Sequence, residues 1–244
     1  ERGNDFSGPA HDFAWCVPIA TQCLHAAGAA LAYKIRKEPR VAVSVVGDGG
    51  SSKGDFYGAI NVAGAMQLPL VTVIVNNQWA ISVPRRMQTS AHTLAQKGIA
   101  AGIESVQVDG NDLIAMRAVL DHALKRARHG HGPTLIEAVT YRLSDHTTAD
   151  DARRYRDEAE VKAAWAREPL SRLRKYLAGI GAWDEAREEA WKLECMARVD
   201  EEINAYLASK PQPLESMFDT MYAELPHDLR AQREQAQEWE KRGG

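Results

Sequence analysis

The sequence has few cysteines, little net charge and no long apolar run. Its three cysteines, Cys16, Cys23 and Cys195, form neither a CxxC pair nor an even framework, so we expect a reduced intracellular compartment. A formal net charge of −3 provides no basic surface for nucleic acid or for an anionic membrane. No apolar run approaches the roughly 20 residues of a membrane span, and we see no signal peptide at the start. We therefore expect neither a nucleic-acid partner nor a membrane partner.

The composition is that of an ordinary globular protein. With 45% hydrophobic and 26% charged residues, a chain of 244 residues can bury a sizeable core. The sequence begins at Glu1 rather than Met, and its opening segment has the character of a loop. We therefore expect that an amino-terminal part of a longer protein precedes it.

Helical and strand-like apolar patterns alternate through the first 155 residues. The β-branched runs "VAVSVV" and "LVTVIV" predict buried strands, and the alanine-rich "PIATQCLHAAGAALAYKIR" predicts a helix packed through small residues. The expected order is helix 18–36, strand 41–46, helix 55–66, strand 70–75, helix 93–101, strand 105–108, helix 112–129 and strand 133–141. This alternation predicts an α/β fold with a doubly wound, mainly parallel sheet. We predict that this domain covers 1–155 and that a charged, helical carboxyl-terminal region covers 156–244.

Two of the expected strands end in polar residues that have no evident role in a core. Asp48, Gly49 and Gly50 follow the first strand, and an Asn-Asn pair ending at Asn77 follows the second. In parallel sheets, ligands bind beyond the carboxyl ends of the strands, so these residues are expected to share one crevice. Glycine lets backbone N–H groups approach phosphate oxygens, and carboxylate and amide oxygens suit Mg²⁺. The pattern predicts a site for a magnesium diphosphate.

Each of these motifs alone has an ordinary structural explanation. Asp-Gly and Asn-Asn are common turn sequences, and the segment is not a P-loop, because Ser52 precedes Lys53 where that motif has glycine. The combination is more specific. GDG is followed by twenty-six residues and then NN, and each motif ends an apolar strand, with a helix between them.

The stretch "GDGGSSKGDFYGAINVAGAMQLPLVTVIVNNQWAIS" resembles the α subunit of the E1 component of 2-oxoacid dehydrogenase complexes, of the bacterial pyruvate dehydrogenase type. The resemblance continues through "QTSAHTLAQKGIAAGIESVQVDGND", "GPTLIEAVTYR", "HTTADDARRYR" and "YAELPHDL", and covers nearly the whole chain. It implies the thiamine diphosphate-binding fold, with thiamine diphosphate and Mg²⁺ as cofactors. The side chains of Asp48 and Asn77 and the backbone carbonyl of Trp79 would bind Mg²⁺. Gly49 and Gly50 would contact the diphosphate.

The resemblance also implies roles for residues outside the two turns. Val17 would contribute a backbone contact to the aminopyrimidine ring, and Ile19 would be the apolar wedge that bends the cofactor. Pro18, between them, departs from the residue that is frequent in the family. Arg142 would be a cation that supports the loop or the phosphate. His146 would be the catalytic residue, because an imidazole near the diphosphate and the substrate can help acyl transfer to lipoamide.

The segment around His146 has simpler interpretations as well. Without the resemblance, His146 would be taken for a solvent-exposed loop residue, which is how we interpret His129 and His131. Thr147 lies where eukaryotic relatives carry a phosphorylated serine, but a loop-ordering hydroxyl is the simpler reading. The acidic pair and the arginines of 150–156 either pair with one another when cofactor binds or form a solvated charge run.

The function that the resemblance implies is thiamine diphosphate-dependent oxidative decarboxylation of a 2-oxoacid, in the first place pyruvate, with acyl transfer to the lipoyl group of an E2 partner. The glutamate that activates the aminopyrimidine belongs to a separate β chain in the family, so an α₂β₂ heterotetramer is expected. The location would be the cytoplasm of a bacterium, or the mitochondrial matrix of a eukaryote.

Other functions remain open at this stage. Branched-chain 2-oxoacid and acetoin dehydrogenase E1 α chains share the same motifs. A nucleotide-binding or NAD-binding module on a doubly wound sheet is a more distant alternative, and the absence of GxGxxG argues against it. A purely structural α chain is a third alternative, and the intact Asp48, Asn77 and His146 argue against that.

Overall fold

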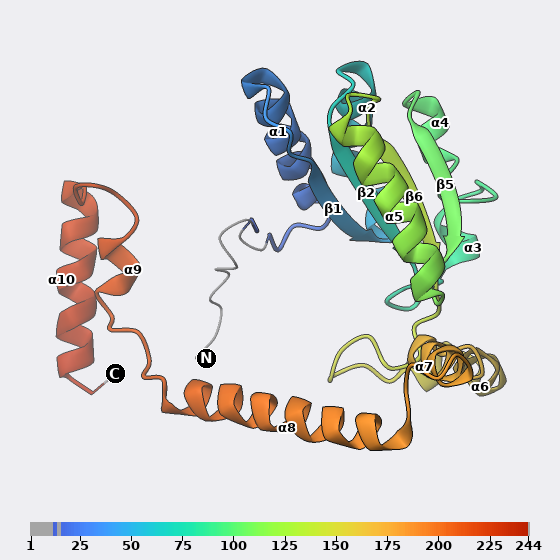
Figure 1. Cartoon of the computed structure of the whole chain (residues 1–244). Helices are drawn as coiled ribbons and strands as arrows, with labels where there is room; N and C mark the ends of the chain where they lie inside the picture. Colours follow the sequence, from blue (N-terminus) through green and yellow to red (C-terminus); the bar gives the residue numbers. More distant parts are fainter. Residues whose placement is uncertain (1–11, 14–15, 244) are drawn as a thin grey trace. The chain divides into compact units, whose positions relative to one another are not determined.

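The computed structural model describes residues 12–13 and 16–243 of the chain (Figure 1). Contacts between residues divide the chain into two compact units, one that ends at Trp183 and one that begins at Asp184. The first unit contains the parallel sheet, and the second is helical.

The first unit is built on four parallel strands in the order β1-β2-β6-β5. Their bounds are Ala42–Gly47 for β1, Leu70–Asn76 for β2, Glu104–Asp109 for β5 and Thr134–Val139 for β6. The central strands β2 and β6 are apolar runs that are buried on both faces, as expected for a parallel sheet covered by helices. The edge strand β1 alternates buried and exposed residues. The predicted α/β fold with a mainly parallel sheet is confirmed.

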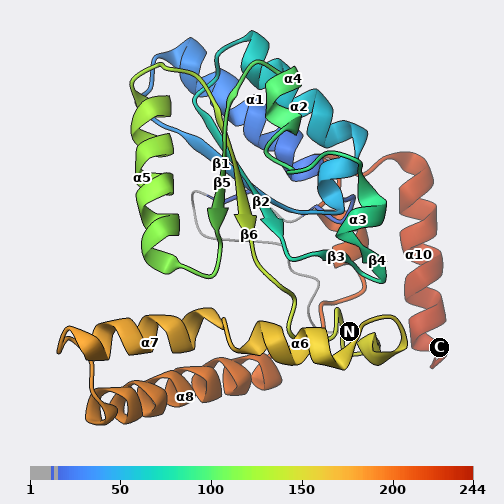
Figure 2. The ribbon, with the colours of Figure 1, turned by 90° about the vertical axis from the view of Figure 1, so that its right-hand side faces the viewer.

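Helices cover both faces of this sheet. Helices α1 (Thr21–Arg36) and α2 (Gly54–Ala65) lie on the face opposite α5 (Leu113–Arg128), as the two views in Figures 1 and 2 show. Alanines at the inner face of α1 allow a close approach to the strands, and the fully buried Phe56 of α2 fills the space beside them. Burial of such a ring contributes about 2 kcal/mol. The side chain of Asp112 caps α5, because it accepts hydrogen bonds from the first helical N–H groups.

The segment between β2 and β5 differs from the prediction. It contains a small hairpin and two one-turn helices: β3 (Trp79–Ala80), β4 (Val83–Pro84), α3 (Arg85–Gln88) and α4 (Lys97–Ala100). The helix predicted over 93–101 was therefore too long. The N–H groups of Lys97, Gly98 and Ile99 bond to carbonyls three residues earlier, so the segment forms tight turns with one short helix. The backbone N–H of Ala95 donates to a Glu137 carboxylate oxygen at 2.9 Å, which ties this segment to β6.

Three further helical segments belong to the first unit. After β6 come the short 3-10 helix η2 (Ala152–Arg154), α6 (Glu158–Trp165) and α7 (Pro169–Gly179), and no strand follows β6 in the described part of the chain. Arg172 of α7 forms ion pairs with Asp109 and Asp112 beyond the end of β5. The division after Trp183 therefore lies later in the chain than the domain boundary that we predict near residue 155.

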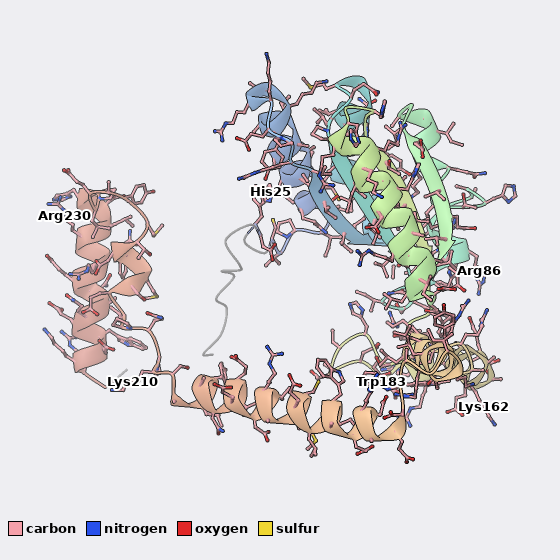
Figure 3. The ribbon with its side chains drawn as sticks, viewed as in Figure 1. His25, Arg86, Lys162, Trp183, Lys210 and Arg230 are labelled. Carbon is pink, nitrogen blue, oxygen red and sulfur yellow. The ribbon has the colours of Figure 1, made fainter. Side chains whose placement is uncertain are left out.

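The second unit contains α8 (Glu185–Ala208), α9 (Ser216–Asp219) and α10 (His227–Lys241). Arg233 of α10 pairs with Asp219 of α9 at 3.1 Å, which holds the last two helices together. Figure 3 shows Lys210 in the connection that follows α8 and Arg230 on α10. Among the described residues, no helix is both long and apolar enough to cross a membrane.

Candidate active site

The turn after β1 is closely packed. Gly49 and Gly50 lead from the strand into the 3-10 helix η1 (Gly50–Ser52). A Cβ atom on Gly49 would lie 2.5 Å from the Cβ of Ala80, and one on Gly50 would lie 2.5 Å from a methyl group of Val46. Neither position can hold a larger residue unless the structure shifts. The glycines therefore let the chain turn sharply with its backbone in contact with the hairpin after β2.

Asp48 precedes these glycines and is almost completely buried, with 2% of its surface exposed. In the described part of the chain its carboxylate accepts a hydrogen bond from the Gln88 amide at 2.7 Å and forms no ion pair. Burial raises the pKa of Asp48 above its ordinary value of 3.8, and the hydrogen bond from Gln88 offsets this only in part. A buried carboxylate in this situation is well suited to bind a cation.

The turn after β2 lies beside the first, because β1 and β2 are neighbours and the Asp48 N–H donates to the Val75 carbonyl at 3.2 Å. Side-chain oxygens hold the shape of this turn. The Asn77 side chain accepts from the Trp79 N–H at 3.1 Å, and Asn76 accepts from both the backbone and the side chain of Gln78. Gln78 has a φ of 73°, a conformation that needs such support in a residue other than glycine.

A buried carboxylate on the neighbouring strand β6 accepts a hydrogen bond from this second turn. Glu137 on β6 has no exposed surface, and one of its oxygens accepts from the Asn76 amide at 2.7 Å. Its other oxygen accepts from the Ala95 N–H. Glu137 thus connects the turn after β2 with the segment that leads into α4.

The carbonyl of Trp79 faces the loop after β6. Arg142 donates a long hydrogen bond of 3.4 Å to this carbonyl, and shorter ones to the Ile81 carbonyl and the Tyr155 hydroxyl. The Tyr155 ring lies 5.6 Å from the Trp79 ring, centroid to centroid. A cation bound by the Trp79 carbonyl would therefore have Arg142 as a neighbour.

His146 lies on the exposed part of the same loop. Its backbone N–H donates to Asp150 at 2.9 Å, and the same carboxylate oxygen accepts from the Tyr155 hydroxyl. The hydrogen bond from Tyr155 is the main cause of a lowered pKa for Asp150. Asp151 pairs with Arg153 at 2.8 Å, so part of the charged run pairs within itself. The loop that carries His146 is thus attached to Trp79 through Asp150, Tyr155 and Arg142.

The apolar residues predicted to meet the aminopyrimidine lie just before α1. A methyl group of Ile19 would be 3.2 Å from a Cβ on Gly50, which places Ile19 against the glycine turn. Ile19 is 61% exposed and Val17 74% exposed. Both side chains are therefore available for contact with a ligand or a partner.

Comparison with known proteins agrees with this geometry. A family model described as "Dehydrogenase E1 component" matches residues 14–215. The chain is 45% identical over 219 residues to the 3-methyl-2-oxobutanoate dehydrogenase subunit alpha of Mycobacterium tuberculosis, covering 90% of this chain and 60% of the relative. It is 42% identical over 238 residues to the pyruvate dehydrogenase E1 component subunit alpha of Staphylococcus aureus, covering 96% and 63%.

The chain belongs to the dehydrogenase E1 component family. It spans less than two thirds of the length of these curated relatives. Their names specify α subunits that act on two different 2-oxoacids, so similarity identifies the type of subunit but does not identify a substrate for this chain.

The site of this E1 chain fits a magnesium diphosphate. The candidate donors are one buried carboxylate, one amide oxygen and one backbone carbonyl, which are the hard oxygen ligands that Mg²⁺ takes when phosphate and water complete its shell. In the described residues no group of three or more histidine, cysteine, aspartate or glutamate side chains could hold a metal ion. A thiolate or carboxylate-rich metal centre is therefore not supported in that part of the chain. Beside Asp48, the packing of Gly49 against Ala80 and of Gly50 against Val46 and Ile19 leaves no room for a side chain at either glycine.

Three residues of this E1 site were missed by sequence reasoning. Gln88, Lys97 and Glu137 all contact the two turns or their supports. Gln88 and Lys97 lie far from GDG in the sequence and have the appearance of surface residues. The only signal for Glu137 is its place in the apolar run "PTLIEAVTY", where a charged residue is unusual.

Proposed function

We propose that this chain is the catalytic part of an E1 α subunit that binds thiamine diphosphate and Mg²⁺ and acts in a 2-oxoacid dehydrogenase complex. The observation that carries the proposal is the buried carboxylate of Asp48, which has no ion-pair partner in the described chain. It lies beside two glycines that cannot carry a side chain, in a member of the E1 family.

Residues of this chain would hold the cofactor at its diphosphate end. Asp48, Asn77 and the Trp79 carbonyl would bind Mg²⁺, and the backbone at Gly49 and Gly50 would meet the diphosphate. Thiamine diphosphate, when bound, would supply a nucleophilic carbon for the keto carbon of a 2-oxoacid and a cationic ring that can take up the electron pair released with CO₂.

The loop after β6 would serve acyl transfer. Arg142 holds the loop against the hairpin through its bonds to the Ile81 carbonyl and the Tyr155 hydroxyl. Held in this way, the His146 imidazole would be able to supply a proton to the lipoyl sulfur that leaves as a thiol. Its exposure is consistent with a partner substrate that arrives from outside the subunit.

We infer pyruvate as the first candidate substrate and a branched-chain 2-oxoacid as the second. The first is supported by the 42% identity to a subunit named for pyruvate dehydrogenase, and the second by the 45% identity to a subunit named for 3-methyl-2-oxobutanoate. The ratio of kcat/KM for pyruvate and for 3-methyl-2-oxobutanoate, measured on the complete enzyme, decides between them. An E1 β chain and a lipoyl-bearing E2 are the proposed partners, in an α₂β₂ arrangement.

Replacement of Asp48 by alanine tests the cofactor site. In the complete enzyme, assembled with its β chain, Asp48→Ala should weaken Mg²⁺-dependent binding of thiamine diphosphate at least ~100-fold, because a cation ligand is lost. Isothermal titration calorimetry measures the affinity. Asp121→Ala is the matched control, since Asp121 pairs with Arg117 on the exposed surface of α5. Unchanged affinity in Asp48→Ala would sink the assignment.

A further inference from the structure

Lys97 is a buried cation directly behind the glycine turn. It begins α4, and only 7% of its surface is exposed. Its ammonium group donates to the backbone carbonyl of Ser51 at 2.7 Å and to the Ser51 hydroxyl at 2.8 Å. The rings of Phe56 and Tyr57 lie on its other side, with centroids 5.9 and 5.3 Å away. In the described part of the chain this lysine forms no ion pair with a carboxylate.

The contacts of Lys97 lead to the backbone of Asp48. The Ser51 hydroxyl lies 2.6 Å from the Asp48 carbonyl oxygen. A lysine ammonium group can only donate, so the hydroxyl accepts from Lys97 and gives its own proton to that carbonyl. Ser51 has no exposed surface, and water does not compete for these bonds. The orientation of the hydroxyl, and with it the position of the turn, is therefore set by the lysine.

Burial makes this arrangement costly for a charged group. Desolvation lowers the pKa of Lys97 to about 8, and the nearby Arg85 acts in the same direction, while Asp48 and Glu137 oppose it. A lysine is almost never buried unless it is paired. A charge kept at such a place suggests a role beyond packing, because an apolar side chain would fill the same volume without the desolvation cost.

We propose that Lys97 is a positioning residue for the cofactor: it fixes the Asp48–Ser52 turn from behind and places a buried positive charge on the protein side of the diphosphate. In a medium of low dielectric constant such a charge acts over a longer distance than it would in water. The glycine backbone offers a diphosphate only neutral N–H groups. The positive charge of Lys97 would in addition offset the negative charge of the diphosphate. This inference rests on the proposed function.

Replacement of Lys97 by methionine separates positioning from packing. In the complete enzyme with its β chain, Lys97→Met should weaken binding of thiamine diphosphate, at saturating Mg²⁺, about tenfold. At saturating cofactor kcat should stay within about threefold of wild type, because Lys97 touches no reacting atom. Calorimetry gives the affinity, steady-state kinetics give kcat, and thermal unfolding without cofactor reports on folding.

Lys34→Met is the matched control. Lys34 also donates to backbone carbonyls, those of Met66 and Gln67 after α2, but it is exposed and lies away from the turn. The Lys34→Met variant should keep the cofactor affinity of wild type, even if its free energy of unfolding changes. Equal loss of affinity in Lys34→Met and Lys97→Met would overturn the proposal, as would unchanged affinity in Lys97→Met.

A second variant covers the case in which Lys97→Met does not fold. Ser51→Ala removes the hydroxyl that connects Lys97 to the Asp48 carbonyl but leaves the lysine bonded to the carbonyl of residue 51, so cofactor affinity should fall about threefold. Unchanged affinity would contradict a role for this hydroxyl.

Asp48→Ala in the same series separates the proposed role of Lys97 from the proposed function of the chain. If Asp48→Ala abolishes binding and Lys97→Met does not weaken it, only the role of Lys97 is wrong. If Asp48→Ala binds normally, the proposed function itself fails.

Discussion

Asp48 shows at the scale of one residue how function and stability oppose each other. Its carboxylate is buried against an amide donor, and its raised pKa means that ionisation costs the fold free energy. A bound cation would recover that cost. The residue is therefore better explained by a ligand than by the needs of the fold.

The pH dependence of stability provides a test without cofactor. Because the pKa of Asp48 is raised by folding, the folded chain binds more protons than the unfolded chain at pH values just above 3.8, and stability is lost as pH rises through the folded pKa. Asp48→Asn carries no such proton. The free energy of unfolding of Asp48→Asn, measured by urea denaturation and compared with that of wild type, should therefore increase from about pH 3.5 to about pH 7. A difference that is constant with pH would contradict the raised pKa.

Sequence reasoning could find Asp48 and the Asn pair because their signal is local. Each follows an apolar strand directly, and parallel strands bring their carboxyl ends to the same edge. Lys97 and Gln88 could not be found in this way. Their roles come from contacts with residues 46 and 40 positions away in the sequence, and nothing in the neighbouring residues distinguishes them from surface side chains.

At the scale of elements, tight turns replace most of the helix that we predict before β5. The apolar periodicity of Thr93 to Ala101, "TLAQKGIAA", favours a helix. In the structure the N–H groups of Lys97, Gly98 and Ile99 bond to carbonyls three residues earlier, and only one turn is helical. The strands were predictable because β-branched runs bounded by Pro and Gly have few alternatives. The hydrogen bond from Ala95 to Glu137 could not be predicted, because nothing in the sequence around Ala95 indicates a contact with a residue 42 positions away.

Glu137→Gln tests the link that Glu137 makes between β6 and the two neighbouring segments. The carboxylate accepts from two N–H donors, the Asn76 amide and the Ala95 backbone. A glutamine can offer an oxygen to only one of them and must turn its own N–H₂ toward the other. The free energy of unfolding should fall by about 1–3 kcal/mol, measured by urea denaturation.

Thr134→Val is the control on the same strand. Thr134 is also buried, and its hydroxyl has no hydrogen-bond partner among the described residues. Loss of that hydroxyl should leave stability unchanged or slightly higher, because no bond is broken. If both variants lose the same free energy of unfolding, the loss is a general effect of substitution in β6. The hydrogen bonds of Glu137 would then contribute no particular stability.

At the scale of the whole molecule, we propose that this chain supplies one side of a shared site. The residues proposed to meet the diphosphate are a carboxylate, an amide oxygen and close-packed glycine backbone. The apolar residues proposed to meet the other end, Val17 and Ile19, are mostly exposed. Exposed apolar side chains beside a ligand site are typical of a surface that a partner covers.

We therefore expect the α subunit alone to be catalytically silent. The group that must act on the aminopyrimidine is proposed to come from the β chain, and loss of a positioned acid or base costs roughly 10²–10⁴ in rate. Decarboxylation of pyruvate by the complete α subunit, with thiamine diphosphate and Mg²⁺, should be at least ~100-fold slower than by the mixture with its β chain.

Size-exclusion chromatography on the same samples should show that activity appears together with the larger assembly. Its obligate interface is expected to bury about 2,000 Å² or more. Asp48→Ala mixed with the β chain controls for assembly, because it should form the larger species and stay inactive. Robust turnover by the α subunit as a monomer would defeat the view that the active site is shared.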